Sequence, residues 1–293
     1  MKILLTGITG QVGQELQDLL PSQGEIIGLG REKMDLAKPD SIAQVIEEIK
    51  PDVIVNASAY TAVDKAETEV ELAQAINGEA PRMMAASATK LGAKLVHIST
   101  DYVFDGQKNT PYQEDDPTNP LGSYGKSKLA GEIGVAGSGA NHVILRTAWV
   151  YGSRGHGNFV KTMLRLGKER EEIRVVADQV GSPSWSKDIA AAIVGLIESQ
   201  AEGIYHFTNS GVASWYDLAV AIFEEAEKIG YPLKIQRVVP ITTSEYPTPA
   251  KRPAYSVLSQ KKITQVLGNY PNYWRHSLRK MLLELWEIEE KAK

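Results

Sequence analysis

Short apolar segments alternate with longer amphipathic segments along the first half of the chain. The apolar segments are rich in leucine and β-branched residues and are bounded by polar residues or glycine, which is typical of strands buried on both faces of a sheet. We expect these strands at residues 3–5, 26–29, 53–55, 95–98 and 143–145. Helices are expected between them at residues 12–20, 41–49, 69–91 and 126–135. The alternation predicts an α/β protein built on a doubly wound parallel sheet.

The regular alternation ends after about residue 151. We expect strands at residues 173–176, 204–207 and 233–238, and helices at residues 186–199, 214–228 and 274–293. Ser186 and Ser214 are expected to cap the first two of these helices. We therefore predict a Rossmann-like domain at residues 1–150 and a smaller α+β domain at residues 151–293, some segments of which return to the main sheet. Residues 240–253 hold four prolines and are expected to form an ordered loop over a binding site, with a plain surface loop as the alternative.

Composition narrows the class of protein. Of the 293 residues, 43% are hydrophobic and 23% are charged, which excludes a disordered or fibrous chain. A net charge of −4 argues against binding a nucleic acid polymer, and the absence of cysteine excludes disulfides, thiolate metal sites and cysteine nucleophiles. No apolar run is long enough to span a membrane, and the N-terminal apolar run is too short for a signal peptide. We expect a cytoplasmic protein.

A glycine-rich turn follows the first expected strand and opens the first expected helix. Gly7, Gly10 and Gly13 stand three residues apart. In this context the glycines allow a tight turn, a close approach to a pyrophosphate and close packing of helix against strand, while the helix N-terminus offers free N–H groups. We assign these glycines, with Gln11 and Val12, to a dinucleotide cofactor. A purely structural turn is the alternative.

The end of the second expected strand bears on the choice of dinucleotide. Arg31, with Lys33 nearby, stands where a 2′-phosphate would lie, so we favour NADPH. Glu32 could instead hold a ribose hydroxyl, which leaves NADH open. Asp35 and Leu36 follow where residues that contact adenine would lie, although Asp35 could equally be a turn residue.

Small residues end the third expected strand. Ala57 and Ala59, followed by Tyr60, would let a cofactor lie flat across the strand ends. Close packing of the chain is the other reading of these residues. We assign all three to the cofactor site.

Tyr124 and Lys128 stand four residues apart in an expected helix and therefore share one face. A lysine ammonium near the phenol would lower the tyrosine pKa, and such a tyrosine can donate a proton to a carbonyl oxygen. This pair alone is a weak signal, because ordinary composition gives about one match per chain by chance. Thr100 ends the fourth expected strand, where it could bind a substrate oxygen or orient Tyr124. Ser99, beside it, is expected to bond the backbone and to border the cofactor.

Six segments of the chain, in order and spread over nearly its whole length, resemble the dTDP-4-dehydrorhamnose reductase family. This family lies in the extended, nucleotide-sugar branch of the short-chain dehydrogenase/reductase superfamily. The segments are residues 56–67, 99–106, 124–128, 146–152, 178–183 and 252–256. The resemblance implies reduction of the C4 ketone of dTDP-4-dehydro-L-rhamnose by NAD(P)H, giving dTDP-L-rhamnose.

The resemblance also implies roles for individual residues. Tyr124 would donate the proton, Lys128 would lower its pKa and bind the nicotinamide ribose, and Thr100 would tune the site. The remaining assignments concern the substrate: Asp101 and Trp149 for the sugar, and Asn158, Gln179 and Arg252 for the nucleotide diphosphate or base. Core packing is the alternative for Trp149, and the other side chains taken singly could be surface polar groups.

Some members of the family are dimers linked by magnesium through glutamates. Glu15 could match one ligand, but Ser186, Lys187 and Asp188 stand at the second position, so we expect no metal and leave the chain as a monomer or a homodimer.

Three other activities remain open. They are another nucleotide-sugar 4-ketoreductase, an epimerase, and a non-catalytic NADP-binding subunit similar to the methionine adenosyltransferase beta subunit. A dehydratase is disfavoured, because Asp101 is followed by Tyr102 where that group has a second carboxylate.

Overall fold

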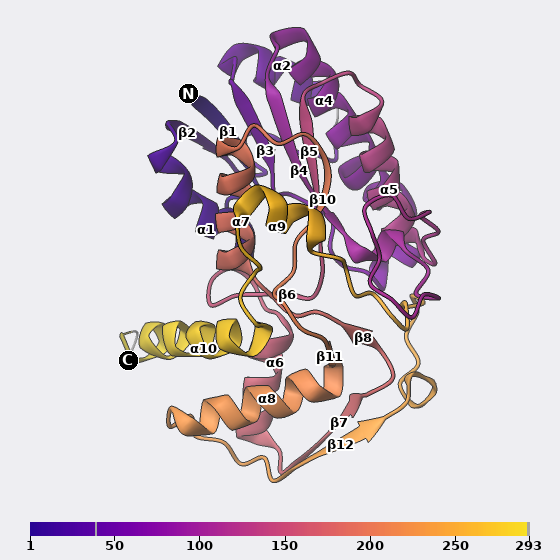
Figure 1. Ribbon diagram of the computed structural model, residues 1–293, viewed down its shortest axis with the longest axis vertical. Coiled ribbons are helices and arrows are strands. Elements are labelled where there is room, and N and C mark those ends of the chain that lie inside the picture. The colour runs from indigo at the N-terminus through magenta and orange to yellow at the C-terminus, as the bar shows by residue number, and fades with distance from the viewer. Residues whose placement is uncertain (39, 292–293) are drawn as a thin grey trace.

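Six parallel strands form the main sheet in the computed structural model, which describes residues 1–38 and 40–291 (Figure 1). In spatial order they are β10 (Gly203–His206), β5 (His142–Thr147), β4 (Lys94–Thr100), β3 (Val53–Asn56), β1 (Lys2–Thr6) and β2 (Glu25–Leu29). The predicted doubly wound sheet is thereby confirmed. The strand order reverses direction between β1 and β3, and ligands of such sheets bind outside the carboxyl ends of the strands at that point.

Helices cover both faces of the sheet, because successive residues of each strand point to opposite faces. Ile3 and Leu5 of β1 face α1 (Gln11–Leu19) and α7 (Ser186–Glu198), whereas Leu4 between them faces the other side. That other side is covered by α2 (Asp40–Ile49), α4 (Ala80–Leu91) and α5 (Ser123–Ala136). The strands are thus apolar on both faces, as their continuous apolar sequence predicts.

The helix expected at residues 69–91 contains an irregular turn. It consists of α3 (Val70–Gln74), the π-helical turn η3 (Ala75–Glu79) and α4. Asn77 in this turn is buried, accepts a hydrogen bond from the Tyr60 N–H, and donates to the Tyr60 carbonyl and to Ser127 Oγ of α5. The turn therefore ties the segment that follows β3 to the helix that carries Tyr124.

The second half of the chain leaves the main sheet after β5 and builds a second core. Its helices are α6 (Phe159–Glu169), α8 (Trp215–Lys228) and α10 (Trp274–Lys291), which pack through apolar residues such as Leu164, Ile222 and Leu278. Its strands form three two-stranded sheets: β6 (Val150–Tyr151) with β9 (Ser184–Trp185), β8 (Val180–Gly181) with β11 (Ala213–Ser214), and β7 (Glu172–Val176) with β12 (Arg237–Ile241).

The chain also crosses back to the main sheet. β10 is the edge strand of that sheet, and α7 and α9 (Lys261–Leu267) pack against the sheet. The helices α6, α8 and α10 lie beyond its lower end (Figure 1). The division of the chain into domains at residue 150 stays a prediction.

Two local predictions differ from the structure. Ser214 caps α8 in a capping box with Asp217, but Ser186 is the first residue inside α7 and its hydroxyl bonds Glu15 instead. The strand expected at 233–238 lies at Arg237–Ile241 and includes Pro240, which is tolerated because β12 has β7 as its single partner. The helix expected at residues 274–293 is present over Trp274–Lys291, and its last two expected residues lie outside those described.

No helix among the described residues combines the length and apolar character needed to cross a bilayer.

A buried ion pair links α5 to the main sheet. The Arg146 guanidinium of β5 donates to both carboxylate oxygens of Glu132 at 2.7–3.2 Å, and each side chain is only 3% exposed. A charge at such a site is stable only while its partner is present.

We predict that Glu132→Gln destabilises the protein strongly, because it leaves the Arg146 cation buried without an anion. The expected loss in the free energy of unfolding is about 3–5 kcal/mol, measured by urea denaturation. The matched control is Glu169→Gln, which breaks the pair with Arg165 on the surface of α6, where the side chains are 61% and 53% exposed. That change is expected to cost less than about 0.5 kcal/mol, and equal losses in the two variants would contradict the prediction.

Candidate active site

The turn after β1 leaves no room for side chains at two of its glycines. Gly7 has a φ of +73°, and a Cβ there would lie 2.6 Å from the Ala57 carbonyl oxygen. A Cβ at Gly13 would lie 2.0 Å from the Gly7 carbonyl oxygen, so this glycine lets α1 pack against the turn. Gly10 is the N-cap of α1, and no side chain caps the helix there. The first N–H groups of α1 thus remain available, and this arrangement fits a cofactor pyrophosphate.

A loop from the second half of the chain approaches the same helix end. A Cβ at Gly155 would lie 2.8 Å from the Gln11 backbone nitrogen. Asn158 Nδ2 donates to Gln11 Oε1 at 2.7 Å and to the Gly152 carbonyl, while its Oδ1 caps α6 by accepting from the Lys161 N–H. The Asn158 amide is thus engaged within the protein, and its assignment to the substrate stays a prediction.

The residues assigned to the adenosine end of the cofactor have different surroundings. Arg31 is 78% exposed and lies 3.5 Å from Asp35 Oδ1, which also accepts the Ala37 N–H as a turn residue would. Leu36 is buried in the core between the sheet and α2. Arg31 is therefore exposed to a ligand although it forms an ion pair with Asp35, whereas Leu36 contributes to packing in this structure.

The end of β3 passes directly beside the glycine turn. Ala57 packs at the edge of the core and its carbonyl oxygen faces Gly7, while the Tyr60 hydroxyl donates to Glu69 at 2.7 Å. Ala59 lies between them and is partly exposed.

Buried oxygens without a partner occur near the carboxyl ends of β4 and β5. Among the described residues, Ser99 Oγ, Asp101 Oδ2 and Thr147 Oγ1 are buried and have no hydrogen-bond partner. The prediction that the Ser99 hydroxyl bonds the backbone is therefore wrong. Because buried polar atoms are nearly always satisfied, each of these oxygens marks a point at this edge of the sheet where a polar ligand would bond.

Thr100 and Asp101 form a short hydrogen-bonded unit at this edge. Thr100 Oγ1 donates to Asp101 Oδ1 at 3.0 Å and accepts the Tyr102 N–H at 3.2 Å. Burial raises the pKa of Asp101 to about 6, although bonds from Ser256 and Thr100 to the carboxylate oppose the shift.

Tyr124 lies in the first turn of α5, with its ring edge-on to Tyr102 at 5.5 Å between centroids. Burial raises its pKa to about 12, Asp101 adds to the rise, and a hydrogen bond with Thr100 opposes it. The expectation that Lys128 lowers this pKa is wrong for the protein without cofactor. Lys128 Nζ instead donates to the Ile98 carbonyl oxygen at 2.6 Å, and burial lowers the pKa of Lys128 to about 8.

A carboxylate that the sequence did not single out holds the start of this helix. Glu67, in the turn η2 (Lys65–Glu67), accepts hydrogen bonds from the Ser123 N–H at 2.8 Å and from the Ser123 hydroxyl at 3.2 Å. A negative charge at a helix N-terminus is favourable. Because 56 residues separate Glu67 from Ser123, no local pattern could have indicated this contact.

Two stacked indoles lie on the side of the second core. The rings of Trp149 and Trp215 are parallel within 4° at 3.6 Å between centroids, and Trp149 adopts a φ of +49°, which is uncommon for a residue other than glycine. Trp215 Nε1 donates to Gln179 Oε1, and Gln179 Nε2 donates to Thr243 Oγ1. Trp215 and Trp149 lie far apart in the chain, so no local sequence pattern indicates their stacking.

Arg252 does not present a free guanidinium. It makes two parallel hydrogen bonds to the Asp64 carboxylate at 3.1 and 2.9 Å. The planar fork expected to bind a diphosphate is thus held by a carboxylate of similar geometry.

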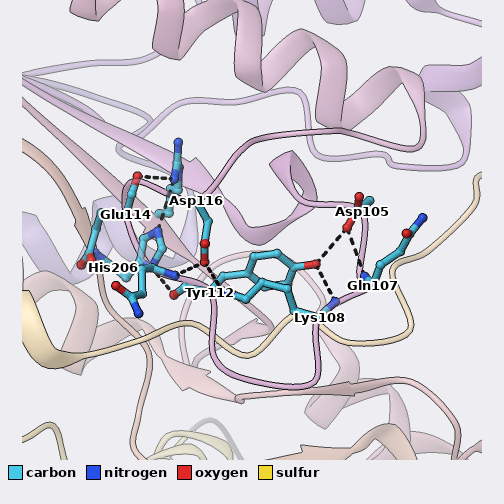
Figure 2. Close-up of polar contacts among 9 residues, drawn as sticks. Asp105, Gln107, Lys108, Tyr112, Glu114, Asp116 and His206 are labelled. Atoms are coloured by element: carbon cyan, nitrogen blue, oxygen red, sulfur yellow. Dashed lines mark hydrogen bonds and ion pairs between the residues drawn. The ribbon is translucent and has the colours of Figure 1, made fainter.

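Hydrogen bonds within the loop between Thr100 and Tyr124, and from this loop to β10, hold it in place (Figure 2). The Tyr112 hydroxyl donates to Asp105 at 3.0 Å, and the Tyr112 carbonyl lies 3.1 Å from His206 Nδ1 of β10. Glu114 accepts the His206 N–H, and burial lowers the pKa of His206 to about 3. Neutral His206 therefore helps to hold the loop that separates Thr100 from Tyr124 along the chain.

The surroundings of Glu15 do not suit magnesium. The Glu15 and Glu284 carboxylates share this site with the ammonium of Lys187, whose Nζ bonds Glu284 Oε2 at 2.8 Å. Burial raises the pKa of Glu15. Within residues 1–38 and 40–291, no three histidine, aspartate or glutamate side chains gather as metal ligands would. Divalent cations of this type prefer several anionic oxygens and no competing cation.

The chain is similar over nearly its whole length to proteins already known. Residues 1–286 match the family model described as RmlD substrate binding domain. A dTDP-4-dehydrorhamnose reductase of Burkholderia thailandensis is 46% identical over 289 residues, covering 95% of this chain and 97% of that protein. The crystal structure of a dTDP-4-dehydrorhamnose reductase of Clostridium acetobutylicum has a TM-score of 0.91 at 41% identity, covering 98% of this chain and 100% of that one. The Bacillus anthracis reductase in complex with NADP has a TM-score of 0.90 at 40% identity, covering 97% and 99%.

Asp101 predicts a pH dependence of stability. Its pKa rises from the usual 3.8 to about 6 on folding, so the folded protein binds this proton more tightly than the unfolded chain. The stability that this proton contributes is complete below about pH 4 and is lost as the pH rises through about 6. We expect the free energy of unfolding of the wild type, relative to Asp101→Asn, to fall across this window in urea denaturation.

Asp105→Asn is the matched control. Hydrogen bonds, first that from the Gln107 N–H, lower the pKa of Asp105, so this carboxylate contributes stability that is lost as the pH falls through its folded pKa. A flat difference between wild type and Asp101→Asn from pH 4 to pH 7 would contradict the assignment.

Proposed function

The chain belongs to the dTDP-4-dehydrorhamnose reductase family, and from this membership we propose that it reduces the C4 ketone of dTDP-4-dehydro-L-rhamnose to dTDP-L-rhamnose with NADPH or NADH. This is the last step in the formation of dTDP-rhamnose. The observation that carries the proposal is the half-buried phenol of Tyr124 beside Thr100 and the unpartnered oxygens at the carboxyl end of β4.

The cofactor would lie across the carboxyl ends of β1 and β3 and supply the hydride. Gly7, Gly10 and Gly13 leave the space for its pyrophosphate, and the free N–H groups of α1 would bind the phosphate oxygens. Arg31 is exposed and would bind a 2′-phosphate through its planar guanidinium, so NADPH is the favoured form. Complex formation with NADP in the Bacillus anthracis relative supports this part of the proposal.

Tyr124 would donate the proton to the ketone oxygen. A pKa raised to about 12 keeps the phenol protonated throughout the physiological range, which is the form a proton donor needs. Thr100 lies close enough to the phenol to influence its pKa and would help to orient it toward the substrate oxygen. Lys128 would bind the nicotinamide ribose and stabilise the phenolate as it forms.

Substrate binding would require an exchange of partners. Arg252 would release Asp64 to bind the diphosphate, and Gln179 would release Thr243 or Trp215. Trp149 would offer an aromatic face to the sugar, and Asp101 would accept from a sugar hydroxyl.

Reduction fits the site better than elimination. The residue after Asp101 is Tyr102, whose ring packs against Tyr124, so the second carboxylate needed for proton transfer at adjacent carbons is absent from that position. The cytoplasm as location, and a monomer or homodimer as the working form, remain parts of this proposal.

The test is a reductase assay with dTDP-4-dehydro-L-rhamnose generated in place by the preceding enzymes. NADPH and NADH oxidation are followed by absorbance, and the product is identified by mass and NMR. We expect dTDP-L-rhamnose. Tight NADPH binding without oxidation would overturn the proposed reaction and favour another deoxysugar or a non-catalytic role.

We predict that Tyr124→Phe lowers kcat by about a hundredfold or more, because the proton donor is lost. Its NADPH affinity, measured by fluorescence titration, is expected to stay close to that of the wild type. Tyr270→Phe, at a residue 67% exposed and outside the site, is the control and is expected to retain wild-type kcat. Turnover of Tyr124→Phe at the control rate would remove Tyr124 from the mechanism.

A further inference from the structure

A row of buried polar side chains crosses three neighbouring strands and ends at Lys128. The strand register places Thr6 of β1 beside Asn56 of β3, and Asn56 beside His97 of β4. All three side chains are at most 2% exposed and point to the face covered by α5. The sequence predictions assigned no role to Thr6, Asn56 or His97.

The backbone N–H of Ser58 determines which atoms of the row donate hydrogen bonds and which accept them. The Ser58 N–H donates to Asn56 Oδ1 at 3.1 Å, and Thr6 Oγ1 donates to the same oxygen at 2.8 Å. A backbone N–H can only donate, so this contact fixes which end of the Asn56 amide is the oxygen. Asn56 Nδ2 therefore faces His97 Nδ1, 3.1 Å away, as a donor.

The orientation of Asn56 determines the tautomer of His97. Since Nδ1 accepts a hydrogen bond, the proton of the neutral ring lies on Nε2. Burial and the nearby Lys128 lower the pKa of His97 well below its usual value, so the ring does not become cationic near neutral pH. His97 Nε2 lies 3.5 Å from Lys128 Nζ, and an N–H is directed at the lysine nitrogen.

Lys128 Nζ already has an acceptor on its other side. It donates to the Ile98 carbonyl oxygen at 2.6 Å. An ammonium has no lone pair with which to accept from His97, whereas a neutral amine can donate to Ile98 and accept from His97 at the same time. The two contacts together match the hydrogen-bonding capacity of the amine.

We propose that Asn56, oriented by the Ser58 N–H, and His97 form a positioning device that holds an imidazole N–H against Lys128 Nζ and thereby favours the neutral amine over the ammonium. Lys128 then exchanges a proton with its surroundings near neutral pH. The state of the amine does not depend on the proposed reaction, but its bearing on catalysis rests on that function.

The other charged groups around α5 do not reverse this preference. Glu132, one turn further along the helix, favours the ammonium, but its carboxylate is bonded to Arg146 of β5. Glu67 of η2 is bonded to Ser123 at the start of the helix. The remaining groups on the elements packed against α5 include Tyr124 on α5 itself, Asp101 on η4 (Asp101–Val103), and the Glu79–Arg82 pair of η3 and α4. Burial remains the largest influence and lowers the pKa of Lys128 to about 8.

The first test uses the wild-type protein without cofactor or substrate. Nitrogen-15 NMR distinguishes the two neutral tautomers of histidine and the imidazolium, and the His97 signals are assigned by their absence in His97→Phe. We expect the Nε2–H tautomer from pH 5 to pH 9. An Nδ1–H tautomer, or protonation of His97 in this range, would overturn the proposal.

The second test reverses the direction of the hydrogen bond between residue 56 and His97 by a near-isosteric substitution. In Asn56→Asp an oxygen replaces the donor, so His97 Nδ1 becomes protonated and Nε2 becomes an acceptor for the Lys128 ammonium. We expect the Lys128 titration, followed by NMR of isotope-labelled lysine, to move upward by about one pH unit or more. Thr6→Val is the matched control. It keeps the Ser58 contact and is expected to leave both the tautomer and the titration unchanged.

A double-mutant cycle separates the tautomer from the added charge. If His97 transmits the effect, Asn56→Asp raises the Lys128 midpoint much less in a His97→Phe background. A rise of equal size in both backgrounds would show that the carboxylate acts through space and would overturn the proposal. None of these readouts needs turnover, so a failed reductase assay leaves them valid.

Discussion

The cost of ionising a buried group governs the chemistry of the candidate site. Lys128 and Asp101 are buried and Tyr124 is half-buried at the carboxyl edge of the sheet, and the pKa of each moves toward the value that favours its neutral form, to about 8, 6 and 12 respectively. Burial is the largest cause in all three. A phenol that stays protonated is suited to give a proton to a ketone, because the proton is present when hydride arrives.

The sheet supplies the geometry that makes this burial possible. Parallel strands end at one edge, so the glycine turn of β1, the polar end of β4 and the first turn of α5 meet although they are distant in sequence. The same register aligns Thr6, Asn56 and His97 behind Lys128. The positions of the ionisable groups, and the direction of the hydrogen bonds that reach them, therefore follow from the strand order.

The hydrophobic pattern predicted the main sheet well, because strands buried on both faces leave long apolar runs. It predicted the second half less well, since strands of two residues such as β8 and β11 are too short to show a period. The glycine turn and the Tyr124–Lys128 pair were recognisable as local motifs. The pKa of Tyr124 was not, because helical spacing shows which side chains share a face but not how deeply they are buried. Glu67, Trp215 and His97 act through contacts between distant segments, which no local pattern reveals.

A spectrophotometric titration of the Tyr124 phenol measures whether desolvation keeps this side chain protonated. Phenolate absorbance is recorded against pH for the cofactor-free wild type, and the titration of Tyr124→Phe is subtracted to isolate the one residue. The account predicts that Tyr124 contributes no phenolate below about pH 10, in keeping with a pKa raised to about 12. A component that ionises between pH 6 and pH 8 would show that desolvation does not raise the pKa of Tyr124. It would instead indicate that Lys128 is the dominant influence on the phenol.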